Sequence, residues 1–128
     1  MAVTYSSTAK DARMTAVRDA IDAGGAAGKI EICTAGYASV LATITLGYSG
    51  ASTGTVSGGV LTLAGFPRSD TSADNTGTAA VARIRTSASA DVVTGLTVGT
   101  SGSDINLDST SITTGQTVTL SSATITHA

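Results

Sequence analysis

Apolar side chains recur every three or four residues near the start of the chain, at Met14, Val17 and Ile21, and charged side chains occupy positions between them. This spacing predicts an amphipathic helix over residues 8–24. The apolar stripe is narrow and rich in alanine, and an isolated helix of this length is only marginally stable in water. We therefore expect the helix to lie on a sheet or on a neighbouring subunit.

Both ends of this helix carry sequence signals. Ser7 or Thr8 can accept hydrogen bonds from the first helical amides, and Gly24-Gly25 supplies the positive φ that ends many helices. Arg18 and Asp22 are four residues apart. We expect them to form an ion pair on the helix surface, which would contribute about 0.2–0.5 kcal/mol.

After Gly28 the apolar residues alternate with polar ones, which is typical of strands. Short alternating runs follow, separated by segments rich in Gly, Ser and Thr. The sequence predicts strands at residues 30–33, 39–46, 59–63, 79–86, 92–98 and 105–107, and a closing hairpin around Thr114-Gly115.

The last of these runs changes its inward face part-way along. Val118 and Leu120 have even numbers, whereas Ala123 and Ile125 have odd numbers. An extra residue in one strand of a pair produces such a shift. We therefore expect a β-bulge at Ser121-Ser122.

Short strands with regular turn signals between them favour a mainly β fold, namely an antiparallel β-sandwich of the jelly-roll kind with one N-terminal α-helix. The chain has 128 residues, which is the size of one domain. We assign residues 1–7 to an N-terminal arm, 8–24 to the helix and 29–128 to the sandwich. Unequal spacing of the Thr-Gly steps argues against an internal repeat.

Composition limits the class of partner. The net charge is −2 and only 12% of the residues are charged, so the chain lacks the positive field that nucleic-acid binding needs. Its apolar runs are far shorter than the roughly 20 residues of a transmembrane helix. We expect neither nucleic acid nor a membrane as a partner. Residues 1–7 lack the basic and apolar parts of a secretory signal, so we expect the protein to mature in a cytoplasm.

The candidates for catalysis are few. Cys33 is the only cysteine and cannot form an intramolecular disulfide, and His127 is the only histidine. A nucleophile and its base must lie within hydrogen-bond distance, and nothing in the spacing of these two residues indicates this. We interpret Cys33 as a packing residue, and we expect neither enzymatic activity nor a cofactor.

Two loops have features of ligand sites. The segment 24–29 is rich in glycine, but it follows a helix and precedes a strand, which is the reverse of a phosphate-binding loop. Asp70, Asp74 and Asn75 could contribute oxygen ligands to Ca²⁺, yet such residues also stabilise turns through their own backbone. We favour a helix end for the first loop and turns for the second, and we expect no metal.

Arg83 and Arg85 alternate with apolar residues on a predicted strand, so the two guanidinium groups project from one face. They could bind carboxylates of a partner, or pair with acids of the same chain, or serve as a solubilising face. Residues 32–67 contain no charged side chain. An uncharged surface of this kind costs little to desolvate against another protein, which favours assembly.

The order of elements resembles a family of small virion structural proteins of tailed phages. The resemblance covers nearly the whole chain, and the helix and the Gly-Thr-Ser-Gly stretch are its most distinctive parts. The similar stretches are residues 12–24, 40–46, 59–63, 72–80, 98–107 and 123–127.

The resemblance implies a capsid decoration (cement) protein on the exterior of the virion, which binds the major capsid protein as a dimer or trimer. The family implies no catalytic residues. An extended arm could add a strand to a neighbour. We expect partner contacts from Arg83 and Arg85 and from the arm residues Ala2, Val3, Thr4 and Tyr5.

Two other functions stay open at this stage. One is a tail, fibre or baseplate component that binds a host surface glycan, because head and tail proteins share β-sandwich folds. A small hydrolase would need a cluster of titratable residues around His127.

Overall fold

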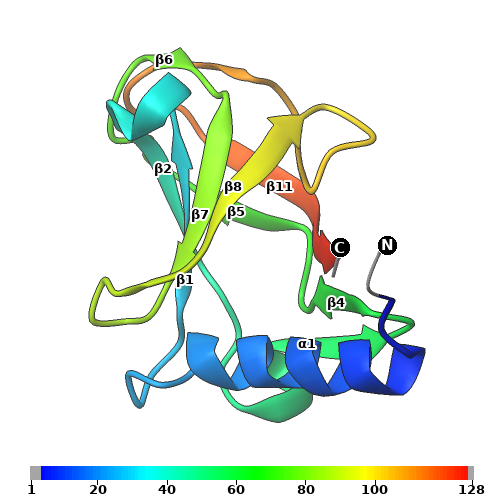
Figure 1. The fold of residues 1–128 in the computed structure, drawn as a ribbon. Helices are drawn as coiled ribbons and strands as arrows, with labels where there is room; N and C mark the ends of the chain where they lie inside the picture. Colours follow the sequence, from blue (N-terminus) through cyan, green and yellow to red (C-terminus); the bar gives the residue numbers. More distant parts are fainter. Residues whose placement is uncertain (1–3, 127–128) are drawn as a thin grey trace.

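The computed structural model describes residues 4–126, which are mainly β with a single α-helix near the N-terminus (Figure 1), so the predicted class is confirmed. The helices are α1 (Ser7–Ile21) and the short 3-10 helices η1 (Ala35–Tyr37) and η2 (Gly50–Ser52). The strands are β1 (Lys29–Cys33), β2 (Val40–Thr45), β3 (Gly54–Ser57), β4 (Val60–Leu63), β5 (Arg68–Asp70), β6 (Gly77–Thr78), β7 (Val81–Arg85), β8 (Asp91–Gly99), β9 (Ile105–Leu107), β10 (Ser111–Ile112) and β11 (Val118–Thr126).

Helix α1 lies close to the predicted range of 8–24. Its N-cap is Ser6 rather than the predicted Ser7 or Thr8, and the extended backbone of Ser6 lets its Oγ accept a hydrogen bond from the amide of Ala9 at 3.1 Å. The helix ends at Ile21, three residues before the predicted end, and a positive φ of 75° follows at Gly25. Within residues 4–126, no helix has the length and hydropathy needed to cross a membrane.

The predicted ion pair between Arg18 and Asp22 is wrong. The carboxylate of Asp22 instead accepts a hydrogen bond from Thr53 Oγ1 at 2.9 Å, and Arg18 Nη1 donates to the carbonyl oxygen of Gly54 at 3.4 Å. Both partners belong to the start of the β3–β4 hairpin, against which α1 packs. Contacts between the helix and this hairpin therefore replace a surface pair that contributes only a few tenths of a kcal/mol.

Most strands belong to one curled sheet that forms a half-barrel (Figure 1). Their order is β2-β1-β7-β8-β9-β11-β4-β3, and β5 pairs with β11 beside this path. Strands β6 and β10 form a separate two-stranded sheet. The sheet is mixed rather than antiparallel throughout, because β8 and β9 run parallel. A jelly roll is not confirmed.

A short connection between β8 and β9 leads the chain back so that the two strands run parallel. Val98 lies opposite Ile105 although only six residues separate them. Thr97 and Asp104 hold this connection with two hydrogen bonds, from the amide of Thr97 to Asp104 Oδ2 and from the amide of Asp104 to Thr97 Oγ1, each at 3.0 Å. The antiparallel expectation is wrong at this pair of strands, where the two hydrogen bonds between Thr97 and Asp104 stand in place of a hairpin turn.

The last strand, β11, joins three parts of the sheet. Its first residues pair with β5, its middle residues with β9 and its last residues with β4. The register with β9 shifts between Leu120 and Ser122. This shift confirms the bulge predicted at Ser121-Ser122.

The predicted hairpin around Thr114-Gly115 is wrong, although the turn itself forms. The strand before the turn, β10, pairs with β6, and the strand after it, β11, pairs with other strands. The amide of Gly115 donates to the carbonyl oxygen of Ala73 at 2.8 Å. This bond ties the turn to the segment before β6 and separates the two flanking strands. The short strands β3, β5 and β6 were not among the predicted strands.

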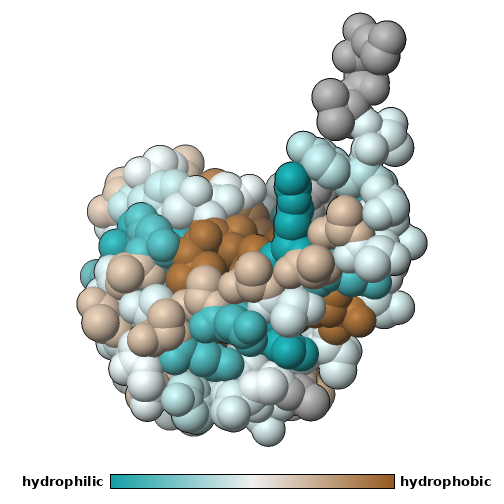
Figure 2. Space-filling model, turned by 60° about the horizontal axis from the view of Figure 1, so that its bottom comes forward, coloured by the Kyte–Doolittle hydropathy of each residue, from teal (hydrophilic) through white to brown (hydrophobic). Residues whose placement is uncertain are grey.

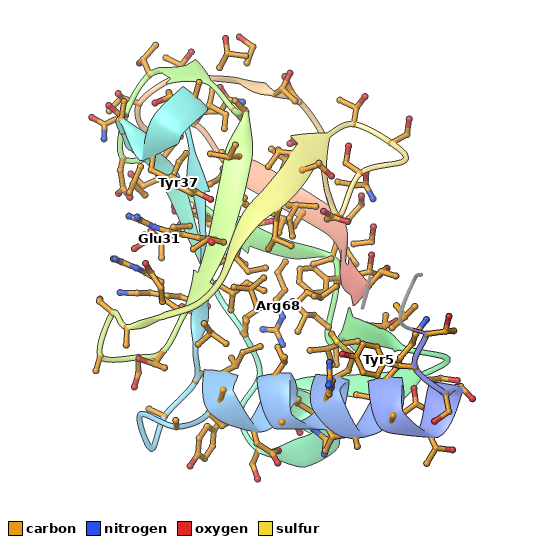
Figure 3. All side chains as sticks on the ribbon, viewed as in Figure 1. Tyr5, Glu31, Tyr37 and Arg68 are labelled. Carbon is orange, nitrogen blue, oxygen red and sulfur yellow. The ribbon has the colours of Figure 1, made fainter. Side chains whose placement is uncertain are left out.

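One edge of the sheet, strand β2, is covered by the segment 68–75. Three of the four covering hydrogen bonds reach every second residue of the strand, at Leu41, Thr43 and Thr45, and the fourth reaches Val40; only the bond to Leu41 joins two main-chain groups. They run from Asp74 N to Leu41 O at 2.7 Å, from Thr43 N to Asp70 Oδ2 at 3.0 Å, from Arg68 Nη1 to Thr45 O at 3.3 Å and from Asn75 Nδ2 to Val40 O at 2.8 Å. Figure 3 shows Arg68 in the centre of the view, between the strands and α1.

The core fills the space between the curled sheet and α1. Met14 and Ile21 are the buried residues of α1, and Leu61 of the β3–β4 hairpin is fully buried with them in one apolar cluster. The next residue, Thr62, is exposed because side chains alternate along a strand. The helix thus packs on the Leu61 side of the hairpin, as the narrow apolar stripe predicts.

Replacing Leu61 with Ala should lower the free energy of unfolding by about 2–5 kcal/mol, because the smaller side chain leaves a cavity beneath α1. Thr62→Ala, one residue away on the exposed face, should change it by about 0.5 kcal/mol or less. Urea unfolding of both variants measures the difference. Equal effects at the two positions would contradict the placement of α1.

Candidate protein-binding surface

Four charged side chains form an ion-pair network on strands β1, β7 and β8. Glu31 of β1 lies opposite Arg83 of β7, and Arg85 lies two residues further along β7 on the same face. Glu31 Oε1 is 2.7 Å from Arg83 Nε and 3.6 Å from Arg85 Nη1. Arg85 Nε in turn bonds Asp91 Oδ1 at 2.6 Å. One carboxylate with only 10% of its side chain exposed therefore serves two arginines.

Tyr37 of η1 extends this network. The guanidinium carbon of Arg83 lies 5.2 Å from the centre of the Tyr37 ring, a distance at which the cation is attracted to the ring face. The hydroxyl of Tyr37 accepts a hydrogen bond from the amide of Gly95 at 2.6 Å. Figure 3 shows Glu31 and Tyr37 along the same side of the molecule. Contacts from β1 and η1 thus hold the guanidinium of Arg83 in place, and β8 in turn holds Tyr37.

The hydrogen bond between Arg85 and Asp91 changes the proton affinity of both groups. It raises the pKa of Arg85 and lowers the pKa of Asp91 below its usual range. Burial raises the pKa of the Cys33 thiol, and the charge of Arg83 opposes this effect. At neutral pH the pair is therefore fully charged, and the thiol stays protonated.

The prediction that Arg83 and Arg85 project from one face is supported by their common partner, Glu31. Both arginines pair with acids of the same chain, which is one of the alternatives that the sequence left open. Arg83 uses only Nε in this pairing, so its terminal nitrogens can still donate to a partner. A partner contact through these arginines stays a prediction.

A second surface lies on the outer side of β3, β4 and β11 and consists of hydroxyl side chains beside the half-buried Val60. Thr55 lies opposite Thr62, and Thr62 lies opposite Thr124, so three threonines form a row across three strands. Cross-strand Thr pairs of this kind stabilise sheets by packing and hydrogen bonding. The hydroxyl face, as we name it, comprises Thr55, Ser57, Thr62, Ser122, Thr124 and Thr126.

The hydroxyl face carries no charge. Thr55, Ser57 and Thr62 belong to the uncharged stretch 32–67, which indicated such a surface from the sequence. The part on β11 was missed, because Thr124 is 62 residues from Thr62 in the chain and only the strand pairing brings them together. Ser122 continues the face towards β9, where its Oγ accepts a hydrogen bond from Asn106 Nδ2 at 2.9 Å.

The acidic loop residues serve the backbone of their own loops. Asp70 accepts hydrogen bonds from the amides of Thr43 and Ser72, each at 3.0 Å. Asp108 Oδ1 accepts from the amides of Ser109 at 3.0 Å and Thr119 at 3.3 Å. Across residues 4–126, no three His, Cys, Asp or Glu side chains form a group that could hold a metal ion.

Cys33 and the glycine-rich segment 24–29 have packing roles. Cys33 is fully buried on β1, and its Sγ is 3.8 Å from the carbonyl oxygen of Glu31. Gly28 lies so close to Ile21 and to the carbonyl oxygen of Arg85 that an added Cβ would overlap them. His127 lies outside the described residues.

The arm is described only in part, since Ala2 and Val3 lie outside the described residues. Thr4 and Tyr5 are exposed. The guanidinium carbon of Arg13 lies 4.0 Å from the centre of the Tyr5 ring, and Figure 3 shows Tyr5 beside α1. Tyr5 therefore contacts the helix of its own chain, and its contact with a partner stays a prediction.

Part of the core reaches the surface on the face where α1 lies. Figure 2 shows an apolar area there, bordered by hydrophilic side chains. The partly buried apolar side chains that pack on the core are Val17, Val56, Phe66, Val92, Val93 and Val98.

Comparison with known proteins gives no relative for these surfaces: no family model matches the chain, and no curated protein or solved structure is significantly similar to it.

Glu31→Gln should lower the free energy of unfolding by about 1.5–3 kcal/mol, because it removes the charge that bonds two arginines while keeping the size of the side chain. Asp19→Asn is a matched control, since Asp19 is 68% exposed and lies 3.7 Å from Arg18. It should change the free energy by about 0.5 kcal/mol or less. Denaturant unfolding at neutral pH measures both, and similar losses would contradict a special role of Glu31.

The bond between Arg85 and Asp91 should make stability depend on pH at the acid end. Because the folded state lowers the pKa of Asp91, its contribution is complete above the unfolded value of about 3.9 and is lost as the pH falls through the lower folded value. The stability difference between the wild type and Asp91→Asn should therefore shrink in acid. Urea midpoints of both proteins across this range measure it, and a constant difference would contradict the pairing.

Proposed function

We propose that this protein is a structural virion protein that decorates a phage capsid by binding the major capsid protein as an oligomer. The observation that carries the proposal is the hydroxyl face, an uncharged surface that spans β3, β4 and β11. The resemblance of nearly the whole sequence to small virion proteins of tailed phages is the reason for proposing a phage particle.

The chemistry of the hydroxyl face suits attachment to another protein. Threonine presents a methyl group and a hydroxyl together, so it can pack against apolar atoms and also donate or accept a hydrogen bond. No charged side chain loses its hydration when a partner covers such a surface. The same hydroxyls keep the free protein hydrated before it binds.

The rigid arginine network offers a second, charged contact. The guanidinium of Arg83 is fixed by Glu31 and Tyr37, so little side-chain entropy is lost when its terminal nitrogens bind a carboxylate. Arginine favours such planar, paired contacts. An acidic segment of the capsid protein is the partner that this chemistry fits.

The number of copies in purified particles, measured by quantitative mass spectrometry against the major capsid protein, tests the proposal. A stoichiometry close to that of the major capsid protein is the expected result. A few copies per particle would overturn it and would favour the tail, fibre or baseplate component that binds a host glycan.

Thr62→Lys tests whether the hydroxyl face is the attachment surface. A charge in the middle of this face should lower the copy number per particle, because the lysine must lose water on binding. Ala88→Lys adds the same charge at an exposed residue between β7 and β8 and should leave the copy number unchanged. Equal occupancy of both variants would place attachment elsewhere.

A further inference from the structure

Strand β3 is the second edge of the sheet, and the hairpin register shows which of its residues face outward. The amide of Ala64 donates to the carbonyl oxygen of Thr53 at 3.1 Å, so these two residues form a hydrogen-bonded pair. In an antiparallel pair, hydrogen-bonded positions alternate with positions whose N–H and C=O point away. Val56 therefore presents its main-chain donor and acceptor to the outside.

Among the described residues of β3 itself (Gly54–Ser57), Val56 is the only one whose outward N–H and C=O both lack a partner. The carbonyl oxygen of Gly54 accepts a hydrogen bond from Arg18, but no hydrogen bond reaches the outward N–H and C=O of Val56 from any residue in the described range 4–126. The opposite edge, β2, has four hydrogen bonds from the segment 68–75. The β2 edge is thus covered and the β3 edge is open at Val56. An open edge can pair with another strand.

The side chains of β3 allow this strand to pair with β3 of a second copy. If two β3 strands pair antiparallel about an axis at Val56, Thr55 of each copy lies opposite Ser57 of the other, and Gly54 lies opposite Gly58. No like charges meet, because residues 32–67 are uncharged. No bulky side chain stands at the ends of the pairing, because both end positions are glycine.

We propose that β3 pairs edge to edge with β3 of a second copy, about a twofold axis at Val56. The N–H of each Val56 then donates to the C=O of the other, which satisfies both open groups. The hydroxyl faces of the two copies become one continuous surface across the joined sheets. This inference deepens the proposed function and rests on its oligomeric part, and it selects a dimer over a trimer, because a twofold contact closes with two chains.

A charge-swap pair on the full-length protein tests both the contact and its register. Thr55→Lys with Ser57→Lys puts lysine opposite lysine at two places, whereas Thr55→Lys with Ser57→Glu puts lysine opposite glutamate. Thr55 and Ser57 are exposed, so neither variant disturbs the core, and circular dichroism checks the fold. Sedimentation equilibrium of the purified proteins gives the dimer dissociation constants.

The double-lysine variant should dimerise about tenfold more weakly than the wild type or worse, because like charges face each other. The lysine–glutamate variant should recover wild-type dimerisation. A monomeric wild type, a double-lysine variant that dimerises normally, or equal losses in both variants would each overturn the inference. Dimerisation is measured on the purified proteins in solution, whereas the capsid role is tested by the copy number of the wild type in particles, so failure of the dimer is distinguishable from failure of the capsid role.

Discussion

The pairing of β11 with three other strands is the constraint on which the sheet depends. Residues 118–126 are the partner that β5, β9 and β4 share, and these strands come from distant parts of the chain. Without β11, the β3–β4 hairpin beneath α1 would have no hydrogen-bonded link to the strands that follow β8. The bulge at Ser121-Ser122 is part of the same constraint, because it lets one strand keep apolar side chains inward against partners on both sides.

Several of the few charged side chains form contacts within the fold, and the outer side of β3, β4 and β11 carries hydroxyl side chains instead. Glu31 and Asp91 bind arginines, and Asp70, Asp104 and Asp108 accept hydrogen bonds from amides of neighbouring loops and strands. Each of these bonds is directional, and several join residues far apart in the chain, so they fix neighbouring strands and loops relative to one another. The proposed attachment surface is thus a result of how the carboxylates are distributed.

Local patterns predicted local structure well and pairings poorly. The helix, most strands and the bulge could be predicted from the spacing of apolar residues, because each depends on residues close together in the sequence. Strand β3 was missed because it follows directly on a stretch rich in Gly, Ser and Thr that resembles a loop, and the parallel pairing of β8 with β9 depends on contacts in their connection. In the candidate site, alternation placed Arg83 and Arg85 on one face, but their acidic partners and the Thr62–Thr124 contact depend on tertiary structure.

The cover over β2 also limits how far such sheets can grow. A sheet with two open edges can add strands on both sides, and repeated addition produces fibres. In this protein Asp70, Asp74 and Asn75 occupy the hydrogen-bonding groups of one edge, so addition can proceed from the β3 side alone. This protein can therefore present one open edge, at β3, without forming fibres through its sheet.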